Sequence, residues 1–279
     1  MLHYPFKPWF LPVLASVFSQ LVGAAALAAL EPSGSVQGLT TSVSSYYATK
    51  LIDPGDASFG RHAGTSLSMS LPTPFGWKFS LRAGLMQDLE SERREVEFQN
   101  TSVTLTPKDL TITDGLTIAS FINGSIATNE NDKVYLGYLG GLSVGGSCDY
   151  QLYQSGSVSL QVGGGLSVSR EFYEYDAAKS GVYNTAYSYA YSGFVSLSQG
   201  PITAGASYGS GEKWRTDGET LPQSYSHSVY VSYQATSRLS FKVKEGLSDR
   251  VYKHDEVRSN LRVYDRELTQ LAMSAAYTF

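Results

Sequence analysis

Segments of about ten residues that alternate strictly between apolar and small polar side chains run through most of this 279-residue chain. A period of two indicates β-strands whose two faces meet different environments. The rule holds for residues 66–71, 79–85, 157–169 and 228–233. After the first thirty residues the chain has no clear helical period, so the sequence predicts an all-β fold.

The composition of the two strand faces separates a water-soluble sheet from one that meets lipid. Alternation alone is also compatible with a secreted β-sandwich or a lipocalin-like barrel, whose apolar faces point inward. Many predicted strands reach ten or more residues, whereas soluble strands average about five or six. Their polar face carries Ser, Thr and Gly, and only 16% of all residues are charged, where about 25% is usual. Because every backbone amide in lipid needs a partner, strands of this kind must form a closed antiparallel transmembrane β-barrel.

The connections between the predicted strands alternate in length, which gives a strand count. Short links are expected at residues 72–76, 107–115, 155–156, 199–201 and 235–238. Longer, charged links are expected at residues 51–62, 88–95, 128–133, 171–184, 209–224 and 248–260. Eleven links join twelve strands, and an even number with short and long ends is typical of transmembrane barrels. The alternation slips between Phe98 and Val103, so residues 100–115 hold either a bulge, which keeps twelve strands, or an extra hairpin, which makes fourteen.

The first 28 residues are predicted to be a cleaved signal peptide, leaving residues 29–279 as one barrel domain. Lys7 precedes an apolar run, and residues 26–28 form a small-x-small cleavage site. A retained helical anchor is the alternative, because apolar character continues to Leu30. The single cysteine, Cys148, permits no intramolecular disulfide and no cysteine metal site, and we expect it to be buried or to face lipid.

The C-terminal strand alternates Leu271, Met273, Ala275, Tyr277 and Phe279 with small residues. It resembles the last strand of bacterial outer-membrane β-barrel proteins, whose final aromatic residue is read by the barrel-assembly machinery. The resemblance covers residues 36–279. It implies an integral protein of the Gram-negative outer membrane, in contact with lipid and lipopolysaccharide, with Tyr277 and Phe279 as its assembly signal.

Twelve strands tilted by about 40° enclose a backbone cylinder about 24 Å wide, which leaves a lumen of roughly 10 Å when small side chains line it. We therefore expect a narrow, porin-like passive channel for small hydrophilic solutes. The alternation places Arg82, Lys242 and Lys244 in the lumen at mid-depth, and Arg262 and Arg266 near the outer mouth. Such a cationic stripe favours anions.

Two details of this charge pattern stay open. The five cations could instead pair with acids of the loops: Asp249, Asp255, Asp265 or Glu267. Glu245 would face lipid, unless a bulge at Glu245-Gly246 turns it inward.

Other functions are weaker on the same residues. A structural or surface-interaction barrel would use residues 209–224 and 248–260 to bind a partner or lipopolysaccharide. Lipid-modifying barrel enzymes, such as outer-membrane phospholipase and lipid A 3-O-deacylase, carry a His-x-Ser pair, but Val229 stands two residues after His227. No catalytic residues, metal site or cofactor are therefore predicted. The glycines at 163–165 are interpreted as room for bulky aromatics on neighbouring strands, not as a phosphate site. A net charge of −4 argues against a nucleic-acid partner.

Overall fold

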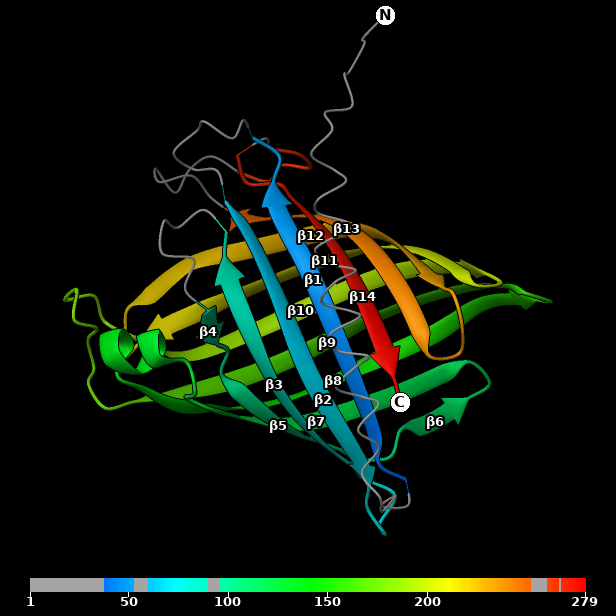
Figure 1. Cartoon of the computed structure of the whole chain (residues 1–279), viewed down its shortest axis with the longest axis horizontal. Helices are drawn as coiled ribbons and strands as arrows, with labels where there is room; N and C mark the ends of the chain where they lie inside the picture. Colours follow the sequence, from blue (N-terminus) through cyan, green and yellow to red (C-terminus); the bar gives the residue numbers. More distant parts are fainter. Residues whose placement is uncertain (1–37, 53–59, 90–95, 252–259, 266) are drawn as a thin grey trace, which may run out of the picture.

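A computed structural model describes residues 38–52, 60–89, 96–251, 260–265 and 267–279. One antiparallel sheet closes on itself, because β1 (Thr40–Lys50) pairs with β2 (Arg61–Pro72) on one side and with β14 (Gln270–Thr278) on the other (Figure 1). The other strands are β3 (Lys78–Asp88), β4 (Val96–Phe98), β5 (Thr101–Thr106), β6 (Leu110–Thr113), β7 (Leu116–Ile126), β8 (Tyr138–Ser155), β9 (Val158–Tyr173), β10 (Thr185–Gln199), β11 (Ile202–Arg215), β12 (Thr220–Gln234) and β13 (Leu239–Arg250). Among the described residues the only helix is a single short π-turn, η1 (Asp132–Leu136).

Three short strands, β4, β5 and β6, share one position of the barrel. β4 and β5 pair with β3, and β5 and β6 pair with β7. The step from Glu97 to Ser102 takes five residues, while the facing step from Met86 to Arg82 takes four. The additional residue is a bulge that resets the alternation. The barrel therefore has twelve strand positions, and the fourteen-strand alternative is wrong.

Ten of the twelve positions fall into two groups by strand length, and β7 and the position shared by β4, β5 and β6 lie between them. β8 to β12 have 14 to 18 residues each, and we call them the long arc. β13, β14, β1, β2 and β3 have 9 to 12 residues each, and we call them the short arc. In Figure 1 the blue and red strands of the short arc cross in front of the green and yellow strands of the long arc.

The outward face of the barrel is apolar. Val168 of β9, Leu197 of β10 and Val231 of β12 each expose more than half of their surface, and similar side chains recur on the other strands. A continuous belt of this kind is stable only in lipid, so the barrel is a transmembrane one. Cys148 lies on this face of β8 and is exposed, which agrees with the lipid-facing expectation. In the described ranges, no helix has the length and apolar character that a membrane-spanning helix needs.

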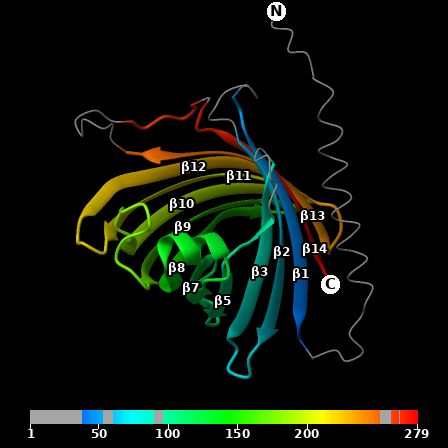
Figure 2. The same cartoon turned by 60° about the vertical axis from the view of Figure 1, so that its left-hand side comes forward.

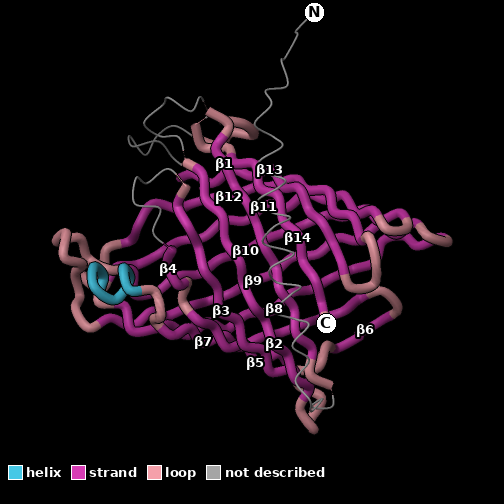
Figure 3. The backbone as a smooth tube through the Cα atoms, in the orientation of Figure 1, coloured by secondary structure: helices cyan, strands magenta, loops and turns pink. Residues whose placement is uncertain are grey.

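The connections differ in length at the two ends of the barrel, as predicted, with two corrections (Figure 3). Residues 209–224 form no long loop, because β11 and β12 continue as a hairpin and only residues 216–219 make the turn. An ion pair of 2.6 Å between Arg215 and Glu219 fixes this turn. The last connection is longer than expected and runs from residue 251 to 269. The predicted signal peptide, residues 1–28, lies outside the described residues.

Candidate functional site: the inner wall of the barrel

Hydroxyl groups cover much of the inner wall. Serine and threonine side chains that stand opposite each other on adjacent strands form hydrogen bonds across the lumen face. The pairs are Ser44 with Ser66 (2.8 Å), Ser70 with Ser80 (2.9 Å), Ser169 with Ser188 (2.6 Å), Ser198 with Thr203 (2.8 Å) and Ser207 with Ser228 (2.9 Å). A hydroxyl group has both donor and acceptor capacity, so each pair keeps hydrogen-bonding capacity for water or solute.

Large aromatic residues also point inward, and four of them lie against a glycine on the next strand. A Cβ atom on Gly163 would come within 2.5 Å of the Phe194 ring, and one on Gly145 within 2.6 Å of Phe121. Two further pairs follow the same rule: Tyr46 against Gly64 and Tyr230 against Gly205. Each ring therefore lies flat along the wall, in the space that a side chain would fill if the glycine were a larger residue. The lumen is wider than it would be if the rings extended toward its centre. This confirms the interpretation of Gly163 as room for an aromatic side chain.

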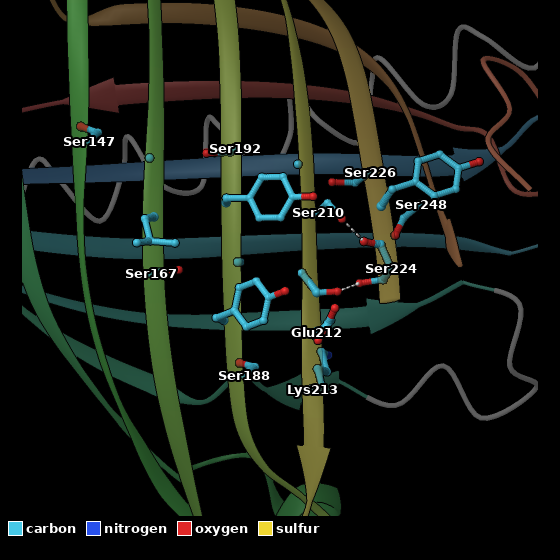
Figure 4. A pocket seen from close by; sticks show the side chains of 18 of the residues that line it. Ser147, Ser167, Ser188, Ser192, Ser210, Glu212, Lys213, Ser224, Ser226 and Ser248 are labelled. Atoms are coloured by element: carbon cyan, nitrogen blue, oxygen red, sulfur yellow. Dashed lines mark hydrogen bonds between the residues drawn. The ribbon is translucent and has the colours of Figure 1, made fainter. Parts of the chain in front are cut away.

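Two hollows open along this wall, with volumes of about 450 and 380 Å³. The larger hollow follows the long arc, and Figure 4 shows serines that line it on consecutive strands. Ser224 donates a hydrogen bond to the Gly211 carbonyl, whereas Ser210, which is opposite the outward Tyr225, donates to the Ser224 carbonyl. The smaller hollow lies where the long arc meets the short arc, between serines of β11 to β13 and the cations Lys50 and Lys244. The inner wall is thus polar and concave.

Three of the five predicted lumen cations lie on inward positions of the short arc. Arg82 of β3 donates a hydrogen bond of 3.3 Å to Ser66. The Lys242 ammonium of β13 lies 3.9 Å from the centre of the Tyr230 ring, and Lys244 follows on the same face. Within the described ranges, none of the three forms an ion pair. The alternative, in which loop acids neutralise these cations, therefore finds no support for Arg82, Lys242 or Lys244.

The structure places Arg262 differently from the expectation. It precedes β14, and its backbone is held by Tyr225 of β12, whose hydroxyl accepts a hydrogen bond of 2.8 Å from the Arg262 amide. Tyr225 belongs to the outward face, so residues 260–265 lie outside the barrel wall. The Arg262 side chain pairs with Asp265, as the loop-acid alternative supposed. Arg266 lies outside the described residues.

The structure decides between the two orientations considered for Glu245, facing lipid or turned inward by a bulge. Pairing continues without a shift from Lys244 through Glu245 to Gly246 on both sides of β13, so no bulge forms there. Glu245 consequently shares the outward face with Val229 and Leu271, in a hollow of the outer wall. No hydrogen bond or ion pair joins it to any described residue.

One inward acid was missed by the reasoning from sequence. Asp149 of β8 lies opposite Gly163, and its Oδ1 atom is buried without a hydrogen-bond partner among the described residues. A Cβ atom on Gly163 would lie 2.5 Å from this oxygen. The position follows the alternation of Ser143, Gly145 and Ser147, so the pattern could have predicted its orientation.

Two long connections are joined at the outer mouth. The η1 segment is fixed to β5 through Asn100, which donates a hydrogen bond of 2.6 Å to Asp132. On its other side Asn184 donates a hydrogen bond of 2.8 Å to the Leu136 carbonyl. Figure 2 shows this helix at the end of the barrel that carries the long connections. In the same rim a hydrogen bond to Glu174 raises the pKa of the Tyr175 hydroxyl above its usual value.

The seam of the barrel contains both residues of the predicted assembly signal. Tyr277 lies opposite Val43 of β1, and the Phe279 amide donates a hydrogen bond of 2.9 Å to the Thr41 carbonyl. The rings of Tyr277 and Phe279 meet edge to face at 4.8 Å between their centres.

The histidine considered for lipid hydrolysis is on the wrong face for a relay. His227 lies on the outward face, with Nε2 2.9 Å from the Arg262 carbonyl, whereas Ser228 points inward and bonds Ser207. Among the described residues no three His, Cys, Asp or Glu side chains gather to hold a metal ion.

Comparisons with known proteins point to an outer-membrane β-barrel fold. No family model matches the chain, and no curated protein does. Among solved structures, an outer-membrane channel from Pseudomonas putida F1, described as COG4313, is similar with a TM-score of 0.58 and 11% identity, over 90% of this chain and all of that one. The NanC porin is similar with a TM-score of 0.55 and 11% identity, over 85% of this chain and 98% of that one.

This chain has the fold of a bacterial outer-membrane β-barrel. The closed twelve-position sheet, its apolar exterior and its polar interior all agree with the class that the C-terminal strand indicated. At 11% identity the similarity establishes the fold only, so the solute has to be inferred from the residues of the inner wall.

Proposed function

We propose that the protein is a passive channel of the outer membrane for small hydrophilic solutes, with a preference for anions. One observation carries this proposal: the inner wall bears hydroxyl groups and three cations, Arg82, Lys242 and Lys244, that have no acidic partner among the described residues. Cations in a water-filled lumen with low-dielectric walls raise the local concentration of anions. The two similar structures with channel and porin descriptions support the choice of class.

Ion conductance of the refolded protein in a planar bilayer tests the channel. Stepwise current increases on insertion are expected, and a reversal potential across a potassium chloride gradient should show chloride preferred over potassium. A protein that inserts fully but conducts no ions would overturn the proposal. It would favour a structural barrel that acts through its outer connections.

We also propose that the barrel has no hydrolytic activity, because His227 and Ser228 lie on opposite faces. Purified protein should release no fatty acid from phospholipid or lipid A. If the wild-type protein releases fatty acid and His227→Ala abolishes that release, this part of the proposal is wrong.

A further inference from the structure

Two acids lie on inward positions of β8 and β9: Asp149, and Glu171, which accepts a hydrogen bond from Tyr173. The Oδ1 atom of Asp149 is buried beside Gly163, the glycine that the Phe194 ring also adjoins, and it accepts no hydrogen bond from any described residue. A carboxylate oxygen left without a donor destabilises a fold, so its presence calls for a reason beyond packing.

Asp149 lies nearly opposite Lys242 and Lys244 around the barrel, and a quarter turn from Arg82. β8 is six strand positions from β14 in either direction, and β13, which carries Lys242 and Lys244, is five positions away. Arg82, on β3, is three positions away on the other side. Asp149, Lys242, Lys244 and Arg82 all lie in the half of their strands nearer the short turns.

This arrangement produces an electric field across the lumen. The positive side is the short arc and the negative side is β8, across a lumen roughly 10 Å wide. That width is close to the Debye length of about 8 Å at physiological salt, so both sides act on a solute between them. The walls have a low dielectric constant and concentrate the field in the water.

We propose that Asp149 and the short-arc lysines make this lumen selective for dipolar solutes, small molecules that carry an ammonium and a carboxylate group at once. The proposal rests on the channel function proposed above. A simple anion is attracted by the lysines and repelled by Asp149. A dipolar solute gains at both ends, because its ammonium group faces Asp149 while its carboxylate faces Lys242 and Lys244. A nonionic isomer gains at neither end.

The experiment compares the entry of two isomers, β-alanine and lactamide, into proteoliposomes at pH 7. Both have the same molecular formula, but only β-alanine is dipolar at this pH. Isosmotic swelling should be faster with β-alanine in the wild type. Asp149→Asn keeps the side-chain shape and should lower the β-alanine to lactamide ratio about threefold. Asp149→Glu should preserve it, and Asp217→Asn in the β11–β12 turn is the matched control.

The outcomes separate the two proposals. If the β-alanine to lactamide ratio of swelling rates is the same in the wild type and in Asp149→Asn, and conductance is normal, the dipolar selectivity is overturned and the channel function stands. No swelling with either isomer and no conductance would overturn the channel and the selectivity with it. If Asp149→Asn fails to fold, Lys242→Gln/Lys244→Gln removes the other side of the field and must lower the same ratio, and an unchanged ratio there counts against the proposal.

Discussion

The long arc and the short arc line one lumen with different chemistry. The long arc offers serines, two of the inward aromatic rings, Phe194 and Tyr230, and the inward acids Asp149 and Glu171. The short arc has shorter strands and carries Arg82, Lys242 and Lys244, together with the seam that closes the barrel. The long arc therefore shapes the passage by packing and carries inward acids, while the short arc carries the mid-depth cations. Variants of the short-arc cations should therefore change ion selectivity, while variants of the long-arc glycines should change packing.

The largest expected effect concerns the seam of the short arc. Deletion of Phe279 removes the amide that bonds Thr41 and the ring that contacts Tyr277, and it also removes the predicted assembly signal. We expect at least a tenfold loss of heat-modifiable barrel in outer-membrane fractions. Phe75→Ala, in an exposed short turn, is the control and should assemble normally. Normal assembly without Phe279 would show that the signal lies elsewhere.

The cations of the short arc should control ion selectivity. Lys242→Gln/Lys244→Gln removes two of the three predicted lumen cations that lie inward without an ion pair, so the chloride to potassium permeability ratio should fall about threefold. The reversal potential in a salt gradient measures this ratio. Lys108→Gln, in a short turn outside the lumen, should leave the ratio unchanged. Equal ratios in the double variant and the wild type would mean that these lysines do not act on the passing ions.

The packing of aromatic rings against glycines in the long arc should determine the unfolding free energy of the barrel and the width of its lumen. Gly163→Ala places a methyl group where the Phe194 ring lies, and we expect a loss of about 1–3 kcal/mol in unfolding free energy. The displaced ring should also lower the conductance. Gly193→Ala is the control, because it faces outward and its Cβ would meet nothing closer than 3.7 Å. Urea unfolding in lipid vesicles measures both variants, and equal stabilities would contradict the packing argument.

The smallest expected effect is on the outer wall of the short arc. Glu245 faces lipid without a partner among the described residues, so Glu245→Leu should raise the unfolding free energy by about 1 kcal/mol. Glu245→Gln should give part of this gain. Glu219→Leu, which loses the ion pair with Arg215 in a turn outside the membrane, should give none. A less stable Glu245→Leu protein would show that this carboxylate has a partner in the membrane.

Strand number, closure and the two faces of the wall could be predicted from the sequence, because alternation and link length fix them locally. The bulge near Gln99 could be predicted for the same reason, because the alternation of apolar and polar residues shifts there. Arg262 was misplaced because residues 261–266 alternate like a strand, while the contact that holds them outside comes from Tyr225, far away in the chain. The orientation of Asp149 follows the pattern, but its lack of a donor depends on how β8, β9 and β10 pack together.

The pairing of β1 with β14 also determines the order in which the barrel can form. Ser42 and Thr278 lie opposite each other although more than two hundred residues separate them. Every other strand position can pair with the one made just before it, but one edge of β1 must wait until β14 has been exported. Pairing two strands that are this far apart in the chain is slow, and an unpaired strand edge can associate with other chains. The period before closure is therefore when this protein most needs protection from aggregation.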